Sequence, residues 1–149
     1  MRCVVQRVLS ARVQVGEETT GEIQKGILAL IGVSTEDGPE DLKYIAEKVM
    51  NLRIFDDENG VMNRSVLDIG GAILAVSQFT LYGDARGGRR PSYFRAAKPE
   101  KANEMYEQMI AFWREAGIQV ETGRFRAEMQ VSLVNDGPVT ILLDSEKAF

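Results

Sequence analysis

Apolar and polar residues alternate along the start of the chain, over residues 2–9 and 11–16. A period of two places every second side chain on the same face of a strand, so both stretches are predicted to be β-strands with one buried face. Residues 26–33 and 72–76 are continuous apolar runs, which are typical of strands buried on both faces. Further strands are expected over residues 119–122, 129–134 and 139–143.

Two segments show the apolar spacing of an amphipathic helix instead. In the first, apolar residues recur three and four positions apart at Leu42, Ile45, Ala46, Val49 and Leu52. Asp37 is a candidate cap for this helix, and Pro39 falls in its first turn, where proline is tolerated. The second helix is predicted over residues 99–116 and ends at Gly117. We interpret its stripe of methionine and aromatic residues as core packing.

Turns separate these elements. Residues 16–21 are predicted to form one turn, and the acidic segment 55–60 ends in Asn59-Gly60. The Asn-Gly pair favours a β-hairpin turn, and the segment lacks the ligand spacing of a calcium-binding loop. Two helices among about eight strands predict an α+β fold with a mainly antiparallel or mixed, barrel-like sheet. No linker, repeat or low-complexity segment divides the chain, so residues 1–149 are expected to form a single domain.

The composition is ordinary for a globular protein, with 44% apolar and 27% charged residues among 149. No apolar run approaches the roughly 20 residues of a membrane helix, so we expect no membrane partner. The N-terminus also lacks the long apolar stretch of a signal peptide. Cys3 is the single cysteine, which rules out an internal disulfide and suits a reducing, cytoplasmic location. We interpret Cys3 as a small strand residue.

The chain contains no histidine. This excludes Ser-His-Asp and Cys-His catalysis, and with one cysteine it removes the usual zinc ligand sets. We expect neither a metal nor another cofactor. If the protein is an enzyme, its general base must be a carboxylate, a lysine, a tyrosine or part of the substrate.

Positive charge is concentrated in one segment, although the net charge of the chain is −4. Residues 85–98, here called the basic segment, contain no acidic residue and five basic ones: Arg86, Arg89, Arg90, Arg95 and Lys98. A local cationic patch on an acidic protein suits a phosphate-bearing ligand that binds at one place only. The alternative is a solvated loop in which these arginines are incidental.

The predicted buried strand 72–76 is followed by Ser77, Gln78, Phe79 and Thr80, of which all but Phe79 are polar. Backbone N–H groups, hydroxyls and an amide at a strand end can hold the oxyanion that develops during acyl transfer. The alternative is a polar strand end whose hydroxyls bond to the backbone. Asp84 offers a carboxylate nearby, but an aspartate after glycine is more typical of a turn.

A second polar segment, Asn135-Asp136-Gly137-Pro138-Val139-Thr140, precedes the last predicted strand. Proline cannot donate to a sheet ladder, which favours Pro138 as the first residue of that strand. Asn135 and Asp136 supply turn chemistry. On residue types alone, this segment is weak evidence for a site.

Together, the two segments resemble the signature motifs of the D-aminoacyl-tRNA deacylases, which hydrolyse the ester between a D-amino acid and tRNA. The residues that carry the resemblance are Ser77-Gln78-Phe79-Thr80-Leu81-Tyr82-Gly83 and Asn135-Asp136-Gly137-Pro138-Val139-Thr140. The resemblance covers the whole chain and includes the arginine-rich stretch Arg89-Arg90-Pro91-Ser92-Tyr93.

The resemblance implies a homodimer with its active sites at the subunit interface, acting on aminoacyl-tRNA. Residues 77–80 would form the pocket for the ester and the terminal adenosine. Gly137 and Pro138 would be joined by a cis bond and enter the partner subunit's site, where backbone carbonyls recognise the amino group and exclude L side chains. Asn135, Val139 and Thr140 would flank them, and the basic segment would bind tRNA. Glycyl esters would also react, because glycine has no side chain to exclude.

Two mechanisms and two other classes of protein stay open. The ribose hydroxyl beside an aminoacyl ester can assist the attack, so that the protein only positions the reactants. Alternatively, Thr80 forms an acyl-enzyme, which needs an adjacent base that the motif does not offer. A non-catalytic RNA-binding module would bind tRNA without hydrolysing the ester. A small-molecule or structural interaction protein would bind its ligand with little dependence on salt.

Overall fold

The structure, a computed structural model, describes residues 1–149 and contains eight strands, two α-helices and one 3-10 turn. Six strands form the main sheet: β1 (Arg2–Val15), β2 (Glu18–Ile23), β3 (Gly26–Gly32), β6 (Ala72–Ser77), β7 (Gln119–Thr122) and β8 (Gln130–Asp144). The other elements are α1 (Pro39–Asn51), β4 (Phe55–Asp56), β5 (Met62–Arg64), the 3-10 turn η1 (Phe79–Tyr82) and α2 (Pro99–Glu115). Neither α-helix is long and apolar enough to cross a membrane.

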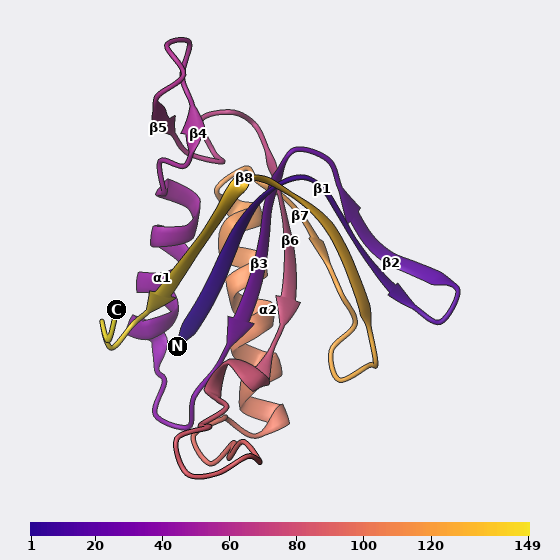
Figure 1. Cartoon of the computed structure of the whole chain (residues 1–149), viewed down its shortest axis with the longest axis vertical. Helices are drawn as coiled ribbons and strands as arrows, with labels where there is room; N and C mark the ends of the chain where they lie inside the picture. Colours follow the sequence, from indigo (N-terminus) through magenta and orange to yellow (C-terminus); the bar gives the residue numbers. More distant parts are fainter.

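Strand β1 lies at the centre of the sheet (Figure 1). It pairs antiparallel with β8 on one side, and on the other side with β3 along its first half and β2 along its second half. Strands β6 and β7 continue from β3 in parallel. The sheet is therefore mixed, and together with the two helices it confirms the predicted α+β class.

The free ends of this sheet approach each other, so that it curls into a barrel-like shape. The Thr20 hydroxyl of β2 donates to the Thr122 carbonyl of β7 at 3.4 Å. Gly21 lies so close to β7 that a Cβ at this position would be 2.4 Å from the same carbonyl oxygen. A residue without a side chain is required for this approach. The curl encloses a small core of Val8, Ala11, Val13, Ile23, Leu28, Ala72, Leu74 and Val76.

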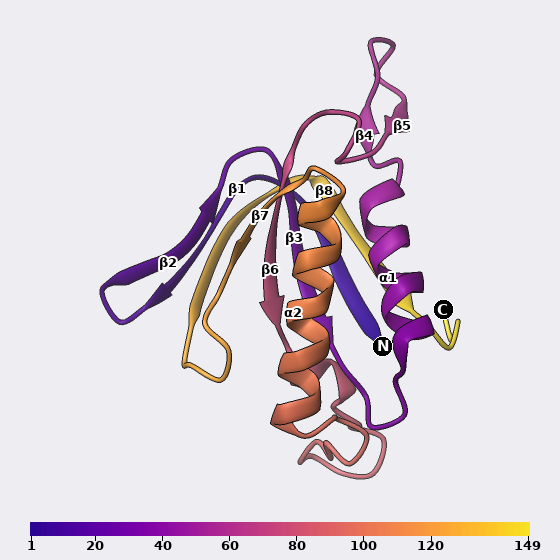
Figure 2. The ribbon, with the colours of Figure 1, turned by 180° about the vertical axis from the view of Figure 1, so that it is seen from behind.

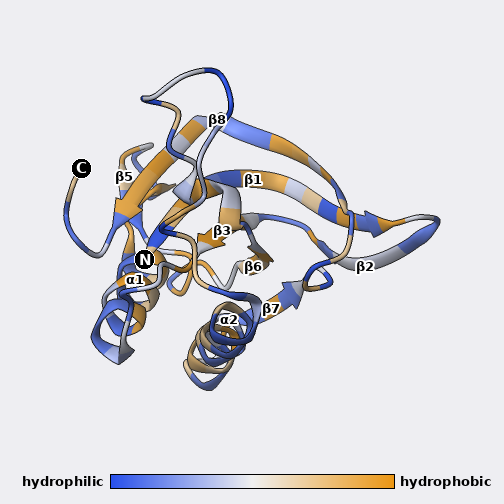
Figure 3. Cartoon of the chain, turned by 90° about the horizontal axis from the view of Figure 1, so that it is seen from below, coloured by the Kyte–Doolittle hydropathy of each residue, from blue (hydrophilic) through white to orange (hydrophobic).

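Both helices cover the other face of the sheet, where the larger core lies (Figures 2 and 3). Their buried faces follow the predicted apolar spacing, with Leu42, Ile45, Ala46 and Val49 in α1. Two buried donors link α2 to its neighbours. The Trp113 indole donates to the Ala46 carbonyl of α1 at 3.0 Å, and the Tyr106 hydroxyl donates to the Ala75 carbonyl of β6 at 2.7 Å.

The prediction that Asp37 caps α1 is wrong. The helix is capped by Gly38, whose N–H donates to the Asp41 carboxylate at 2.9 Å. Asp37 is buried and binds the ammonium group of Met1 at 2.6 Å and the backbone N–H of Ser34 at 2.7 Å. A buried carboxylate needs such partners, and these contacts hold it outside the helix.

Some predicted element boundaries are also wrong. Residues 2–9 and 11–16 belong to the single strand β1, and residues 129–134 and 139–143 belong mostly to the single strand β8. The turn predicted over 16–21 is shorter, because Gly16 adopts a φ of 59° and lets β2 begin at Glu18. The hairpin at Asn59-Gly60 is confirmed, since it joins the antiparallel pair β4 and β5.

Candidate active site

A cavity of about 670 Å³ opens where β6 ends. Ser77, Gln78 and Phe79 line it from the strand end. Val76 of β6 lines it as well. The remaining lining comes from the end of the basic segment, the start of α2, and the stretch from the β7–β8 loop into β8. It consists of Tyr93, Ala96, Ala97, Lys98, Pro99, Ala102, Phe125, Arg126, Ala127, Met129 and Val131. Three of the four residues predicted to be catalytic thus share one cavity.

The first motif leaves the sheet as a helical turn, where a polar strand end was predicted. The Gln78 N–H donates to the Ile31 carbonyl at 2.7 Å, which is the last backbone hydrogen bond of this segment to β3. The chain then turns into η1, closed by Leu81 N–H to the Gln78 carbonyl at 3.2 Å. The N–H groups of Phe79 and Thr80 open this turn and have no acceptor within it. They are the kind of donor that can hold a developing negative charge.

Thr80, the fourth predicted catalytic residue, does not line the cavity. Its side chain is exposed, and its hydroxyl accepts a hydrogen bond from the Gln78 amide. No acidic residue lines the cavity, so no carboxylate is placed there to take a proton from a nucleophile. The charged side chains of the lining are Lys98 and Arg126, which favour a ligand that carries negative charge.

Two aromatic rings stand at the cavity. Phe79 and Tyr93 meet edge to face, with ring centroids 5.1 Å apart. Phe79 remains 55% exposed in spite of this contact. A planar group such as a nucleobase could therefore still reach it.

The basic segment is only partly free to bind phosphate. Arg86 forms two side-chain contacts with Asp84, at 2.9 and 2.7 Å, and Arg95 contacts Glu146 at 2.7 Å. The hydrogen bonds from Arg86 hold the pKa of Asp84 well below its ordinary value, so Asp84 is a poor general base. Arg89, Arg90 and Lys98 form no ion pair and are exposed.

The second motif forms a bulge in β8. Asn135 lies opposite Val8 and Thr140 lies opposite Gln6, so the four residues 136–139 face only Arg7 on β1. Pro138 therefore lies inside β8 and not at a strand start, because the bulge removes the need for its missing N–H. The Gly137–Pro138 bond is cis, as the resemblance implies. Both residues are exposed.

Side chains on both sides fix this bulge. Arg7 donates to the Asp136 carbonyl at 2.8 Å and to the Ile54 carbonyl at 2.7 Å. Asn135 joins the two ends of the bulge. Its side-chain oxygen accepts a hydrogen bond from the Val139 N–H at 2.8 Å, and its side-chain NH₂ donates to the Val139 carbonyl at 3.1 Å. Arg7 is not among the residues predicted from the sequence. No separate signal in the sequence identified it, because Arg7 is one of several polar residues in a strand where polar and apolar residues alternate.

In one chain the two motifs lie far apart along the sheet, because the first follows one end of β6 and the second lies level with the other end of β6. Ser77 is level with Ile31 and Cys3, whereas the bulge faces Arg7 and begins level with Ala72, at the other end of β6. The five-residue difference between Ala72 and Ser77 corresponds to roughly 16 Å along a strand. A single chain therefore does not bring the residues predicted for chiral selection to the cavity.

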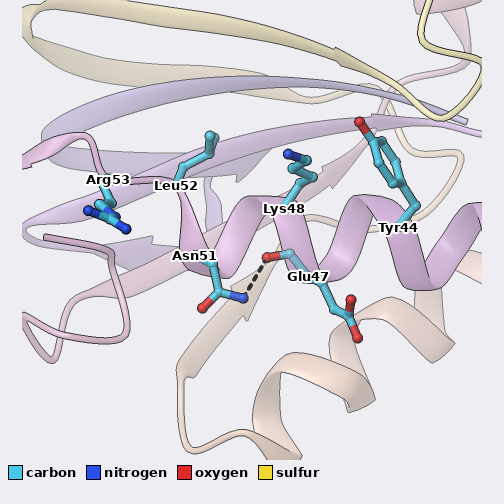
Figure 4. A pocket seen from close by; sticks show the side chains of 6 residues that line it. All are labelled: Tyr44, Glu47, Lys48, Asn51, Leu52 and Arg53. Atoms are coloured by element: carbon cyan, nitrogen blue, oxygen red, sulfur yellow. Dashed lines mark hydrogen bonds between the residues drawn. The ribbon is translucent and has the colours of Figure 1, made fainter. Parts of the chain in front are cut away.

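A smaller hollow of about 370 Å³ lies along α1 (Figure 4). It is lined by Tyr44, Glu47, Lys48, Asn51, Leu52 and Arg53. The Asn51 amide donates to the Glu47 carbonyl at 2.9 Å within the helix. Because no residue of either motif lines this hollow, the cavity at the end of β6 is the candidate active site.

Comparison with known proteins places the chain in a class of enzymes. The family model described as D-Tyr-tRNA(Tyr) deacylase matches residues 4–144. The D-aminoacyl-tRNA deacylases of Thermosipho africanus and Symbiobacterium thermophilum are 59% and 58% identical over 149 residues, covering all of this chain and 100% and 99% of theirs. The chain belongs to the D-Tyr-tRNA(Tyr) deacylase family. The predicted family is confirmed, and with it the class of hydrolase that acts on carboxylic ester bonds.

Two solved structures share the fold of this chain. A protein described as "c-Myc DNA Unwinding Element Binding Protein" is 40% identical, with a TM-score of 0.91 over 97% of this chain and 98% of its own. A probable eukaryotic D-amino acid tRNA deacylase has a TM-score of 0.82 over 96% of this chain and 98% of its own. At 17% identity, the latter supports the fold alone.

Proposed function

We propose that the protein hydrolyses the ester bond of D-aminoacyl-tRNA and releases free tRNA and the D-amino acid. The observation that carries this proposal is the cavity at Ser77, Gln78 and Phe79, which has basic residues and no acidic one in its lining. It suits the aminoacylated terminal nucleoside of a polyanion. The substrate named for the bacterial relatives is the same. The reaction is proposed to take place in the cytoplasm.

The proposed mechanism uses positioning and charge stabilisation. Water attacks the ester carbonyl, and the N–H groups at the start of η1 stabilise the oxyanion. The neighbouring ribose 2′-hydroxyl assists the proton transfer, since no carboxylate or histidine lines the cavity. The carbonyl–oxygen bond of the ester then breaks, and the ribose 3′-oxygen leaves with a proton. Because an aminoacyl ester is already activated, positioning of the reactants by the protein can supply much of the rate acceleration.

Selection against L-amino acids is proposed to come from the bulge of a second subunit. Its exposed Gly137 and Pro138 would enter the cavity of the partner in a homodimer. Arg7 and Asn135 hold the backbone on either side of these two residues, at Asp136 and Val139, so that the carbonyls between them would be rigid enough to reject one hand of a chiral centre. Strands β1 and β8 leave Leu9, Val134 and Leu142 about half exposed, which supports an apolar surface for such a contact. Glycine, without a side chain, would be accepted.

The test follows release of the amino acid from matched D- and L-aminoacyl-tRNA, with glycyl-tRNA as a third substrate. We expect fast hydrolysis of the D and glycyl esters and little of the L ester. A D-aminoacyl-tRNA whose terminal 2′-hydroxyl is replaced by hydrogen should react far more slowly. Binding of tRNA without hydrolysis of any ester would contradict the proposed activity, and an unchanged rate with the deoxy substrate would contradict only the mechanism.

A further inference from the structure

Phe94 is the most exposed of the large apolar side chains, at 90%. A single exposed apolar residue needs no special explanation. Phe94, however, lies within the basic segment, between Tyr93, which lines the candidate active site, and Arg95. Its surroundings therefore decide whether the ring has a role.

The backbone on both sides of Phe94 is fixed by hydrogen bonds. Asp84 and Ser92 exchange two backbone hydrogen bonds of 2.8 and 2.9 Å. On the other side, Ala96 N–H donates to the Tyr93 carbonyl at 3.0 Å, and Ala97 N–H donates to the Val33 carbonyl at 2.9 Å. The Phe94 ring therefore projects into solvent from a backbone that hydrogen bonds fix on both sides. Preorganisation of this kind lowers the entropy cost of binding.

Phe94 also lines a hollow of about 550 Å³, which is separate from the hollow along α1 and is here called the second hollow. The basic segment divides the two spaces, because Tyr93 lines the candidate active site and its neighbour Phe94 lines the second hollow. Other walls of that hollow are the guanidinium groups of Arg2 and Arg95, which stand 4.7 and 5.5 Å from the ring centre of the buried Tyr82. Flat aromatic and guanidinium surfaces are what an unpaired nucleobase stacks on.

We propose that Phe94 stacks on a nucleobase of the unpaired 3′ end of tRNA, upstream of the terminal adenosine, and that this base enters the second hollow. The inference rests on the proposed function, which puts the terminal nucleoside in the adjacent cavity. Arg89 and Arg90, which form no ion pair, lie in the same segment and meet the phosphates of this single strand. Phe94 is accordingly a binding residue that fixes the register of the tRNA end and takes no part in the chemistry.

The first test compares two substrates in Phe94→Ala and Phe94→Tyr. With D-aminoacyl-tRNA, Phe94→Ala should raise KM by about 5- to 150-fold, the change that corresponds to ~1–3 kcal/mol of stacking, and leave kcat nearly unchanged. Phe94→Tyr should restore KM. With a D-aminoacyl ester of adenosine alone, which lacks upstream bases, the Ala variant should match the wild type. Val61→Ala, exposed in the distant hairpin turn, is the control.

The second test is spectroscopic. The protein has one tryptophan, Trp113, which is fully buried, so Phe94→Trp adds the only exposed indole. Its fluorescence should be quenched by the trinucleotide cytidine-cytidine-adenosine and not by adenosine monophosphate. Equal KM values for the wild type and Phe94→Ala, or no quenching, would overturn the proposal. Dissociation of Phe94→Ala dimers into monomers would also overturn it by placing the ring in a subunit interface. Failure of the wild type on every D-aminoacyl ester would instead refute the proposed function.

Discussion

The hydroxyl of Thr80, which lies outside the lining of the candidate active site, accepts a hydrogen bond from the amide of Gln78, which belongs to that lining. A hydroxyl becomes a nucleophile when a base accepts its proton, and here the hydroxyl is itself the acceptor of a hydrogen bond. The nearest acidic residue in the sequence, Asp84, is engaged by Arg86. The position of Thr80 therefore favours hydrolysis assisted by the substrate over an acyl-enzyme.

We expect Thr80→Ala to lower kcat by less than about tenfold, because it removes one hydrogen bond of about 1 kcal/mol and no nucleophile. The measurement is single-turnover hydrolysis of D-aminoacyl-tRNA, and Thr80→Ser, which keeps the hydroxyl, is the matched control. A loss of about 10⁴-fold, or an acyl group found on Thr80 by mass spectrometry of a quenched reaction, would establish the acyl-enzyme instead.

Residue types in the sequence identified the first motif but not the partners that hold the second. Ser77, Gln78 and Phe79 were recognisable because polar residues follow a buried strand, and the structure brings them to one cavity. Arg7 was not recognisable, because its role depends on Asp136 and Ile54, which are 129 and 47 residues away. Contacts of this kind depend on strand register, which a local pattern does not contain.

At the level of elements, β6 carries the site and α2 holds β6 in place. Tyr106 is almost fully buried, and its hydroxyl donates to the Ala75 carbonyl, two residues before Ser77. Burial raises the pKa of Tyr106 to about 12. The folded state therefore binds the Tyr106 proton more tightly than the unfolded chain, in which tyrosine ionises near pH ~10.

This shift predicts a loss of stability at alkaline pH. Between about pH 10 and pH 12 the unfolded chain gives up the tyrosine proton first, so the free energy of unfolding falls, by an amount on the order of 2–3 kcal/mol. Tyr106→Phe should be about 1 kcal/mol less stable than the wild type at neutral pH and should show a smaller alkaline loss. Urea unfolding from pH 8 to 12 measures both, with Tyr44→Phe on α1 as control. Parallel curves for Tyr106→Phe and the wild type would contradict the assignment.

Elements were predictable where the pattern of apolar residues follows burial, on one face of a helix or on both faces of a central strand. The two helices and the runs at 26–33 and 72–76 appear almost as predicted, because apolar periodicity reflects burial directly. The division of β8 into two strands was wrong because Gly137 and Pro138 are typical turn residues. A bulge uses the same residues as a turn, and only the pairing of Asn135 and Thr140 with β1 distinguishes them.

At the scale of the whole molecule, the distribution of charge determines which basic residues are free to bind the phosphates of tRNA. The chain is acidic, yet Arg89, Arg90 and Lys98 remain without ion pairs, whereas Arg86 and Arg95 are compensated by Asp84 and Glu146. The sequence showed the cluster but not its compensation, because Glu146 reaches Arg95 from a segment 51 residues away.

Replacement of both Arg89 and Arg90 by alanine should weaken tRNA binding and reduce its salt dependence. Each lost phosphate contact should lower the slope of log K against log salt by about 0.7–0.9. Binding isotherms between low and moderate salt give the slope, and a double replacement of Arg12 and Arg53, exposed outside the basic segment, is the control. A slope equal to that of the wild type would show that these arginines do not contact phosphates.

The distance between the two motifs requires that any site built from both is shared between chains. In a symmetric dimer, each of two equivalent sites would take its cavity from one subunit and its bulge from the other. A variant with a damaged cavity and a variant with a damaged bulge would then each be inactive alone. Gln78→Ala combined with Phe79→Ala serves as the first. Gly137→Val serves as the second, because a Cβ at Gly137 would meet the Val139 side chain at 2.8 Å and the Arg7 guanidinium at 3.1 Å.

A mixed dimer of these two variants has one site in which both defects meet and one site in which neither is present. Half of the dimers in a random one-to-one mixture are mixed, so we expect about a quarter of the wild-type rate to return after unfolding and refolding the variants together. The rate of D-aminoacyl-tRNA hydrolysis is the measurement, and refolding either variant alone is the control. Recovery should fail if the cavity works with a bulge of its own chain or with none, and a mixture without activity would therefore contradict the shared site.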